Sequence, residues 1–188
     1  LAGTWLISGI IPTMIYYGLQ VLNPTIFLAA TLIICAVISI ATGSSWTTAA
    51  TVGIALIGIG EALGISMGMT AGAVLSGAYF GDKMSPLSDT TNIAAAATDV
   101  KLYDHIQSMM YTTIPSAIIA AIIFFSLSFV YPATIEVNSD VATQTTLSAI
   151  GNMFQFNFLL ILPPIIILYG SLTKKPTVPV MLLSALSA

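Results

Sequence analysis

A twelve-residue segment, Gly81–Asn92, gathers the side chains of this sequence that are best suited to chemistry. It carries two carboxylates, Asp82 and Asp89, and one ammonium group, Lys83, between two apolar runs. Its remaining polar side chains offer neutral oxygens: Ser85, Ser88, Thr90, Thr91 and Asn92. Hard cations prefer oxygen ligands of this kind, and a carboxylate that has released a cation can take up a proton. The segment therefore indicates a site at which a cation and a proton compete.

A second polar segment, Gly43–Thr48, interrupts a long uncharged stretch. About 35 residues from Ile26 to Gly60 carry no charge, and a straight helix of that length would be roughly 52 Å long, against a bilayer core of about 30 Å. The segment therefore predicts either a helix broken within the membrane or the tip of a re-entrant hairpin. A surface loop between two spans is the alternative. The hydroxyls of Ser45, Thr47 and Thr48 are further candidate cation ligands.

Each charged candidate also has a structural interpretation. Asp89 is well placed as the N-cap of a helix over Thr90–Ala97, and Asp82 could form an ion pair with Lys83 in a loop. Lys83 is a counter-charge rather than a ligand in either case. Glu61 follows the Gly43–Thr48 break by about 14 residues, where a helix would return to the interface. It is either part of an ion pathway or a charge solvated at a turn.

The composition places all of these residues in a membrane protein. Apolar residues make up 57% of the chain and charged residues 6%, against roughly 25% charged in a soluble domain. The net charge is −3 and arginine is absent, which argues against nucleic-acid binding. The lone Cys35 reads as a small buried hydrophobe. No spacing of His, Cys or carboxylates indicates a resident metal, and no cofactor is expected.

The predicted fold class is all-α, a polytopic transmembrane helical protein with discontinuous helices or re-entrant hairpins. The sequence starts without methionine and stops within an apolar run, so residues 1–188 are expected to be one transmembrane domain fragment. Gly81 and Pro86 should unwind the helix that precedes them. The other expected spans are Leu1–Val21 with a kink at Pro12, a small-residue packing helix over Gly64–Phe80, Ser108–Tyr131, Gly151–Leu172 and a span opening at Val178.

Loop charges predict the orientation of these spans. Lys174 and Lys175 should lie in the cytoplasm, the acidic loop over Pro132–Thr146 outside, and the connection that holds Lys101 inside again. That connection also holds Asp104 and His105, and it should lie at the membrane surface.

The two polar segments, Gly43–Thr48 and Gly81–Asn92, together resemble the paired signatures of the NhaC family of sodium/proton antiporters, with a looser match through Thr98–Ser116. The resemblance implies a multi-pass secondary transporter of the bacterial inner membrane, with two structural repeats and discontinuous helices. Only one copy of the paired signature occurs here. Most of a second repeat is therefore expected outside this sequence.

Two functions remain open from the sequence. The first is exchange of Na⁺ for H⁺, with Asp89 and Asp82 alternately cation-bound and protonated. The second is a sodium- and proton-coupled exchanger of a small organic acid, of the malate/lactate type, in which Ser44–Thr48 would bind the carboxylate of the organic acid. An enzyme is not expected, because His105 would have to reach a serine at membrane depth. The expected partners are the lipid bilayer, Na⁺ and H⁺, and in the alternative the organic acid.

Overall fold

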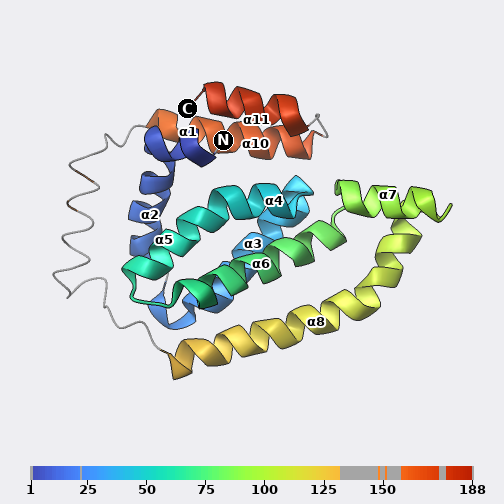
Figure 1. The fold of residues 1–188 in the computed structure, drawn as a ribbon, viewed down its shortest axis with the longest axis horizontal. Coiled ribbons are helices and arrows are strands. Elements are labelled where there is room, and N and C mark those ends of the chain that lie inside the picture. The colour runs from blue at the N-terminus through green and yellow to red at the C-terminus, as the bar shows by residue number, and fades with distance from the viewer. Residues whose placement is uncertain are drawn as a thin grey trace.

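The computed structural model describes residues 2–21, 23–131, 158–173 and 177–187, together with Ser148 and Gly151. Within these residues the chain is helical and contains no strand (Figure 1). The elements are α1 (Ala2–Ile7), α2 (Ile10–Val21), the 3₁₀ turn η1 (Pro24–Ile26), α3 (Phe27–Thr42), α4 (Ser45–Thr48), the π-helical turn η2 (Ala49–Gly53), α5 (Ile54–Ala62), α6 (Met67–Met84), α7 (Asp89–Ala97), α8 (Leu102–Val130), the 3₁₀ turn η3 (Phe158–Ile161), α10 (Leu162–Leu172) and α11 (Thr177–Leu186). The predicted all-α class is confirmed for this part of the chain.

The first predicted span is divided into α1 and α2. The break lies at Gly9, whose φ of 91° is a left-handed conformation that favours glycine. A kink at Pro12 was predicted, and this was wrong. Pro12 lies in the first turn of α2, where a missing backbone N–H costs little. Trp5 of α1 is buried, and its indole N–H donates to Ser184 Oγ of α11 at 3.2 Å.

The polar segment near Gly43 forms the tip of a helical hairpin. Helix α3 ends at Thr42 and is capped by Gly43, which has a φ of 67°, and the chain then reverses direction (Figure 1). Elements α4, η2 and α5 follow as one continuous helix over 45–62, the α4–α5 helix, because Thr48, Ala49, Gly53 and Ile54 all keep right-handed helical dihedrals. The η2 turn is a single π-turn within that helix, a feature often found near functional sites.

Helix α6 packs closely along α3. Gly77 and Gly81, one turn apart, lie against the α3 backbone: a Cβ on Gly77 would meet the Leu32 carbonyl oxygen, and one on Gly81 would meet that of Ala36. Small residues at this spacing allow helices to approach closely in membranes. The predicted packing helix is thus confirmed. Gly81 and Pro86 together were predicted to unwind this helix. The break occurs at Pro86, over residues 85–88, but the part of the prediction that concerns Gly81 was wrong, since α6 continues to Met84.

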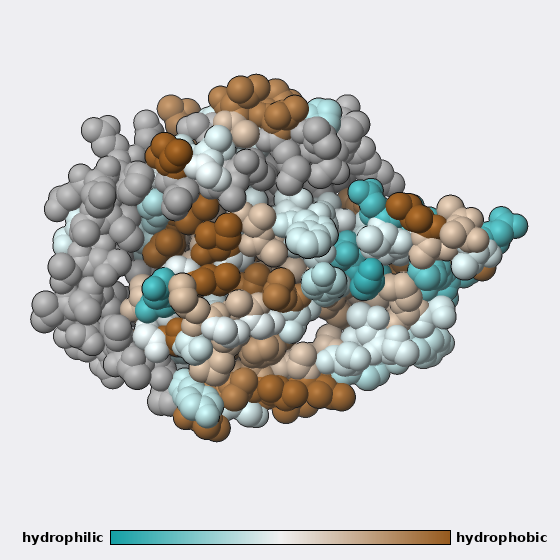
Figure 2. Space-filling view, viewed as in Figure 1, coloured by the Kyte–Doolittle hydropathy of each residue, from teal (hydrophilic) through white to brown (hydrophobic). Residues whose placement is uncertain are grey.

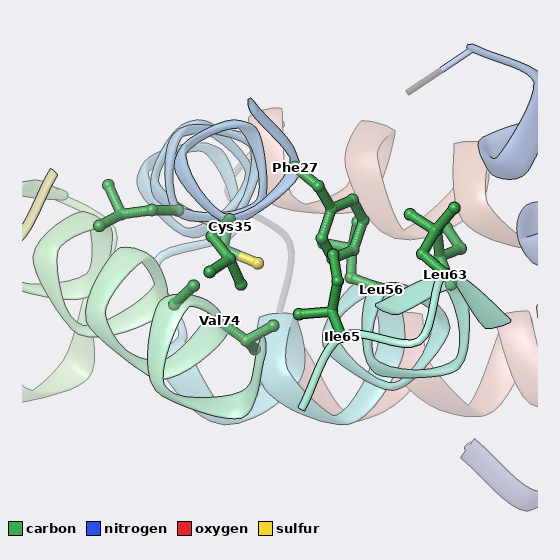
Figure 3. Close-up of a cluster of buried hydrophobic side chains, with 10 residues drawn as sticks. Phe27, Cys35, Leu56, Leu63, Ile65 and Val74 are labelled. Atoms are coloured by element: carbon green, nitrogen blue, oxygen red, sulfur yellow. The ribbon is translucent and has the colours of Figure 1, made fainter. Parts of the chain in front are cut away.

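The apolar core lies between α3, α5 and α6. Its buried members are Phe27, Leu28, Leu32, Cys35, Leu56, Ile59, Leu63, Ile65, Ala73 and Val74. Figure 3 shows the side chains of Phe27, Cys35, Ile65 and Val74 converging on the space between these helices. Cys35 is fully buried and forms no disulfide, so it packs as the small hydrophobe that the sequence indicated. This core fixes the three helices whose ends form the candidate site.

Two described helical stretches are long and apolar enough to cross a bilayer, Pro24–Thr42 and Leu102–Val130. Several residues of the first are buried in the core, whereas few of the second are buried and many are exposed. Apolar residues cover the C-terminal half of α8, and hydrophilic ones gather where α6 ends and α7 begins (Figure 2). The exposed apolar side chains of that half are Ile118, Ile119, Ile122, Ile123, Phe125, Phe129 and Val130.

Some predicted features fall outside the described residues. These features are the acidic loop over Pro132–Thr146 and the lysines at 174 and 175. The orientation of the spans in the membrane, which was inferred from them, therefore remains a prediction. Of the expected span Gly151–Leu172, the structure describes Gly151 and then η3 and α10. Helix α11 lies where the last span was expected to open.

Candidate functional site

The site is centred on Asp82, in the last turn of α6. Its side chain is buried, with 6% of its surface exposed. Ser88 Oγ donates to Oδ1 at 2.7 Å, and Ser45 Oγ donates to Oδ2 at 3.3 Å. Among the described residues Asp82 forms no ion pair, since the Lys83 ammonium donates to Thr90 Oγ1 instead, at 3.2 Å. The ion pair considered from the sequence is therefore not formed, and Asp82 lies in a helix rather than in a loop.

Two helix N-termini meet at the Asp82 carboxylate. Ser45 is the first residue of the α4–α5 helix and Ser88 is the N-cap of α7. A helix N-terminus carries roughly half a positive charge, which favours a nearby anion. The C-terminus of α6, by contrast, disfavours a carboxylate on its last turn. The position of Asp82 therefore destabilises α6. The N-termini of the α4–α5 helix and of α7 offset this cost.

The carbonyl ends of α3 and α6 lie beside these N-termini. Ser85 Oγ, fully buried, donates to the Ile40 carbonyl of α3 at 2.7 Å. Thr91 Oγ1 donates to the Asp82 carbonyl at 3.4 Å. A Cβ on Gly43 would lie 2.6 Å from the Leu87 carbonyl carbon, so the hairpin tip packs directly on the break over 85–88. The two polar segments of the sequence thus form one junction.

The N-terminal end of α7 is more open. Asp89 is exposed and is the first residue of α7, so the N-cap assignment made for it was one residue off. Ser88 occupies the cap, but its hydroxyl accepts no backbone N–H of α7 and donates to Asp82 instead. Asn92 Nδ2 donates to the Ser88 and Pro86 carbonyls, at 2.7 and 2.9 Å. Asn92 therefore stabilises the break.

Thr47 and Thr48 hold the hairpin tip. Thr47 Oγ1 lies 3.1 Å from Ser44 Oγ, and Thr48 Oγ1 donates to the Ser44 carbonyl at 3.0 Å. Ser44 also caps the helix by accepting from the Thr47 amide at 3.2 Å. Both threonines are buried, but their hydroxyls bond to the turn and not to Asp82. Ser44 was not among the predicted cation ligands, although its place after a glycine and before Ser-Trp-Thr-Thr is typical of an N-cap.

The remaining charged candidates lie apart from this junction. Glu61 is exposed near the end of α5, roughly 25 Å along the helix from Ser45. Asp104 and His105 are in the first turns of α8. Among the described residues no three His, Cys, Asp or Glu side chains gather as a metal site. The junction instead offers one buried carboxylate and several hydroxyl and carbonyl oxygens.

The hypothesis of a Na⁺ site drawn from the sequence predicts that the double variant Thr47→Val, Thr48→Val of the full-length protein has an apparent Na⁺ affinity about tenfold lower, equivalent to about 1.4 kcal/mol. Valine keeps the shape of threonine but removes the two hydroxyls that fix Ser44 and, through it, Ser45. Transport at saturating Na⁺ should fall less, since Asp82 remains. The measurement is the Na⁺ concentration dependence of exchange in vesicles. Thr51→Val is the matched control, because its hydroxyl bonds within the helix, to the Thr47 carbonyl at 2.6 Å. Equal affinities in all three proteins would contradict a role for the tip.

Comparison with known proteins connects this junction to a family of transporters. A model of the Na⁺/H⁺ antiporter family matches residues 77–188, which include Asp82 and the whole α6–α7 break. A Haemophilus influenzae protein named as an uncharacterized Na⁺/H⁺ antiporter is 48% identical over 100% of this chain. The malate-2H⁺/Na⁺-lactate antiporter of Bacillus subtilis is 46% identical over 99% of it. The Na⁺/H⁺ antiporter NhaC of Alkalihalophilus pseudofirmus is 42% identical over 97%.

The chain spans 39–40% of the length of these relatives. No solved structure matches it. The family model covers more than half of the chain, and the relatives agree with it in being antiporters. The resemblance seen in the two polar segments is therefore confirmed: the chain belongs to the Na⁺/H⁺ antiporter family.

Proposed function

We propose that the protein containing this chain exchanges Na⁺ for H⁺ across the bacterial inner membrane, and that Asp82 is the group that binds the two ions in turn. One observation carries the proposal: a buried carboxylate is held by two hydroxyls and two helix N-termini, with no cationic side chain bonded to it in the described part of the chain. Within the described residues such a group has no permanent counter-ion. Either Na⁺ or a proton can neutralise it.

The energetics of burial favour this alternation. An isolated buried carboxylate is costly, and an opposite charge about 4 Å away recovers about 4 kcal/mol at an effective dielectric of 20. Na⁺ bound at the carboxylate supplies that charge, with Ser45 and Ser88 as neutral oxygen ligands. When Na⁺ leaves, protonation of Asp82 removes the uncompensated charge. Because one site serves both ions, binding of one excludes the other, and exchange follows.

The remaining predicted residues support Asp82 in this proposal. Ser85 and Thr91 fix the ends of α3 and α6, Thr47 and Thr48 fix the tip, and Asn92 fixes the break. Asp89 and Thr90 lie at the exposed entrance. Glu61 has no place in the site, being at the other end of its helix.

Organic-acid exchange is the second candidate, because one relative is named as a malate-2H⁺/Na⁺-lactate antiporter. A substrate carboxylate would need helix N-termini or an arginine to bind it. Here the two N-termini at the junction already face the carboxylate of Asp82, and the 188 residues contain no arginine. Na⁺/H⁺ exchange therefore fits the described site better.

The membrane arrangement belongs to the same proposal. The hairpin of α3 and the α4–α5 helix would be re-entrant, with its tip beside Asp82 at depth, and α6 and α7 would form one discontinuous helix. Backbone groups freed at such breaks need partners, and Ser44, Ser85 and Asn92 supply them. Apolar α8 would face lipid or the rest of the protein.

Transport by the purified full-length protein in liposomes tests this function. An imposed Na⁺ gradient should move protons in the opposite direction without any organic acid present. Proton movement that requires both Na⁺ and malate or lactate would favour the second candidate. A protein that moves no protons with either substrate would contradict both.

A further inference from the structure

A chain of hydrogen bonds joins the buried Asp82 to the exposed end of α7. Ser88 Oγ donates to Asp82 Oδ1 at 2.7 Å, Thr90 Oγ1 lies 3.0 Å from Ser88 Oγ, and Lys83 Nζ donates to Thr90 Oγ1 at 3.2 Å. Ser88 is fully buried, whereas Thr90 is exposed. The chain therefore runs from the site to the surface of the described structure in two hydroxyl steps.

The direction of this chain follows from what each group can donate. An ammonium group can only donate, so Thr90 Oγ1 accepts from Lys83. An ionised carboxylate can only accept, so the Ser88 proton points at Asp82. Because the Ser88 proton is already used, the Thr90 hydroxyl must be the donor to Ser88 Oγ. Every donor points inward, toward Asp82, as long as Asp82 is ionised.

We propose that Thr90 and Ser88 form the path by which protons reach and leave Asp82, and that Lys83 is a positioning residue that orients it. This rests on the proposed exchange of Na⁺ for H⁺. When a proton arrives from water at Thr90 Oγ1, the Thr90 proton moves to Ser88 and the Ser88 proton moves to Asp82. One proton leaves water and one carboxyl group forms, while both hydroxyls are regenerated. Release is the reverse sequence.

The charged groups around this path are few. Helix α6 contributes Lys83 beside Asp82, and α7 contributes Asp89 in its first turn. Helix α8, which packs against α7, has Asp104 and His105 in its first turns. Helices α3 and α4 contain no acidic, basic or histidine side chain. Lys83 is therefore the one cation within hydrogen-bonding distance of the path in the described structure.

Thr90→Val tests the path in the full-length protein. Valine preserves the shape at 90 and leaves Ser88, Ser45 and Asp82 in place, so the apparent Na⁺ affinity should remain within about twofold of wild type. The maximal rate of Na⁺-driven proton movement should fall about a hundredfold, the lower end of the range typical of a lost proton-transfer group. Thr90→Ser restores a hydroxyl and should restore the rate. Thr98→Val is the matched control. Thr98 is the C-cap at the opposite end of α7, and its hydroxyl donates to the Ala94 and Ala95 carbonyls of that helix and not to the path.

Lys83 is tested by a pair of variants. Lys83→Met removes the donor and should lower the maximal rate about threefold, whereas Lys83→Gln keeps an N–H donor and should remain near wild type. A Thr90→Val protein with the wild-type rate would overturn the path. A Thr90→Val protein in which the Na⁺ affinity falls together with the rate would also overturn it, since Thr90 would then be a cation ligand. Absence of exchange in wild type and Thr98→Val alike would instead contradict the proposed function itself.

Discussion

Asp82→Asn is expected to abolish Na⁺-dependent proton movement by the full-length protein in everted membrane vesicles. Asparagine has nearly the shape of aspartate. Its carbonyl oxygen can accept from one of the two serines, Ser45 and Ser88, and its NH₂ group can donate to the hydroxyl oxygen of the other, so the protein should fold and insert. The lost charge removes about 4 kcal/mol of attraction for a cation about 4 Å away, or about a thousandfold in affinity. Asparagine also cannot carry the exchanged proton. Both halves of the exchange therefore fail together.

Asp89→Asn should have a much smaller effect, because an exposed charge interacts with a cation by only about 1 kcal/mol in water. The matched control is Asp99→Asn: Asp99 is exposed in the turn after α7, and its φ of 52° is a conformation that asparagine tolerates. Membrane content of each variant is measured by immunoblot. Normal exchange by Asp82→Asn, with loss of exchange in Asp89→Asn, would contradict our assignment and make Asp89 the group that binds the two ions.

Gly81→Ala is expected to destabilise the protein and to reduce exchange strongly. A Cβ at this position would lie 2.5 Å from the Ser39 Cβ and 2.7 Å from the Ile40 amide nitrogen, so α6 would have to move away from α3. Overpacking of this kind typically costs about 1–3 kcal/mol. The displacement acts on Asp82, the next residue, and on the Ser85 bond to Ile40. A shift of about 1 Å at a site can cost on the order of a hundredfold in rate.

Gly68→Ala is the matched control on the same helix. Its Cβ would meet only the Ser66 hydroxyl oxygen, at 3.7 Å, and alanine is the better helix former by about 1 kcal/mol. The two glycine variants should therefore shift the melting temperature in opposite directions, as measured in detergent solution on the full-length protein. Similar shifts for both would show that close packing of α3 on α6 does not support the site.

The sequence by itself determined the class of protein and the two segments that matter. An apolar fraction of 57% with 6% charge excludes a soluble domain, and this needs no knowledge of tertiary contacts. Gly43–Thr48 and Gly81–Asn92 stand out because polar groups are costly in an apolar surrounding unless they have a function. The helix break at Pro86 and the turn at Asn23 and Pro24 were predictable for the same local reason, since proline and its preceding residue restrict the backbone.

Only the tertiary structure decided which residues of these segments meet. Whether Asp82 or Asp89 is buried depends on where α6 ends, and the close contact of Gly81 with α3 extends that helix to Met84. Local signals alone favoured an earlier end and gave Asp89 the cap. Likewise, Ser45 and Asp82 are 37 positions apart, and their contact requires the hairpin tip to pack on the α6–α7 break. Gly43 permits the chain reversal locally, but the contact between the two segments depends on the packing of α6 against α3, which the residues of one segment alone do not encode.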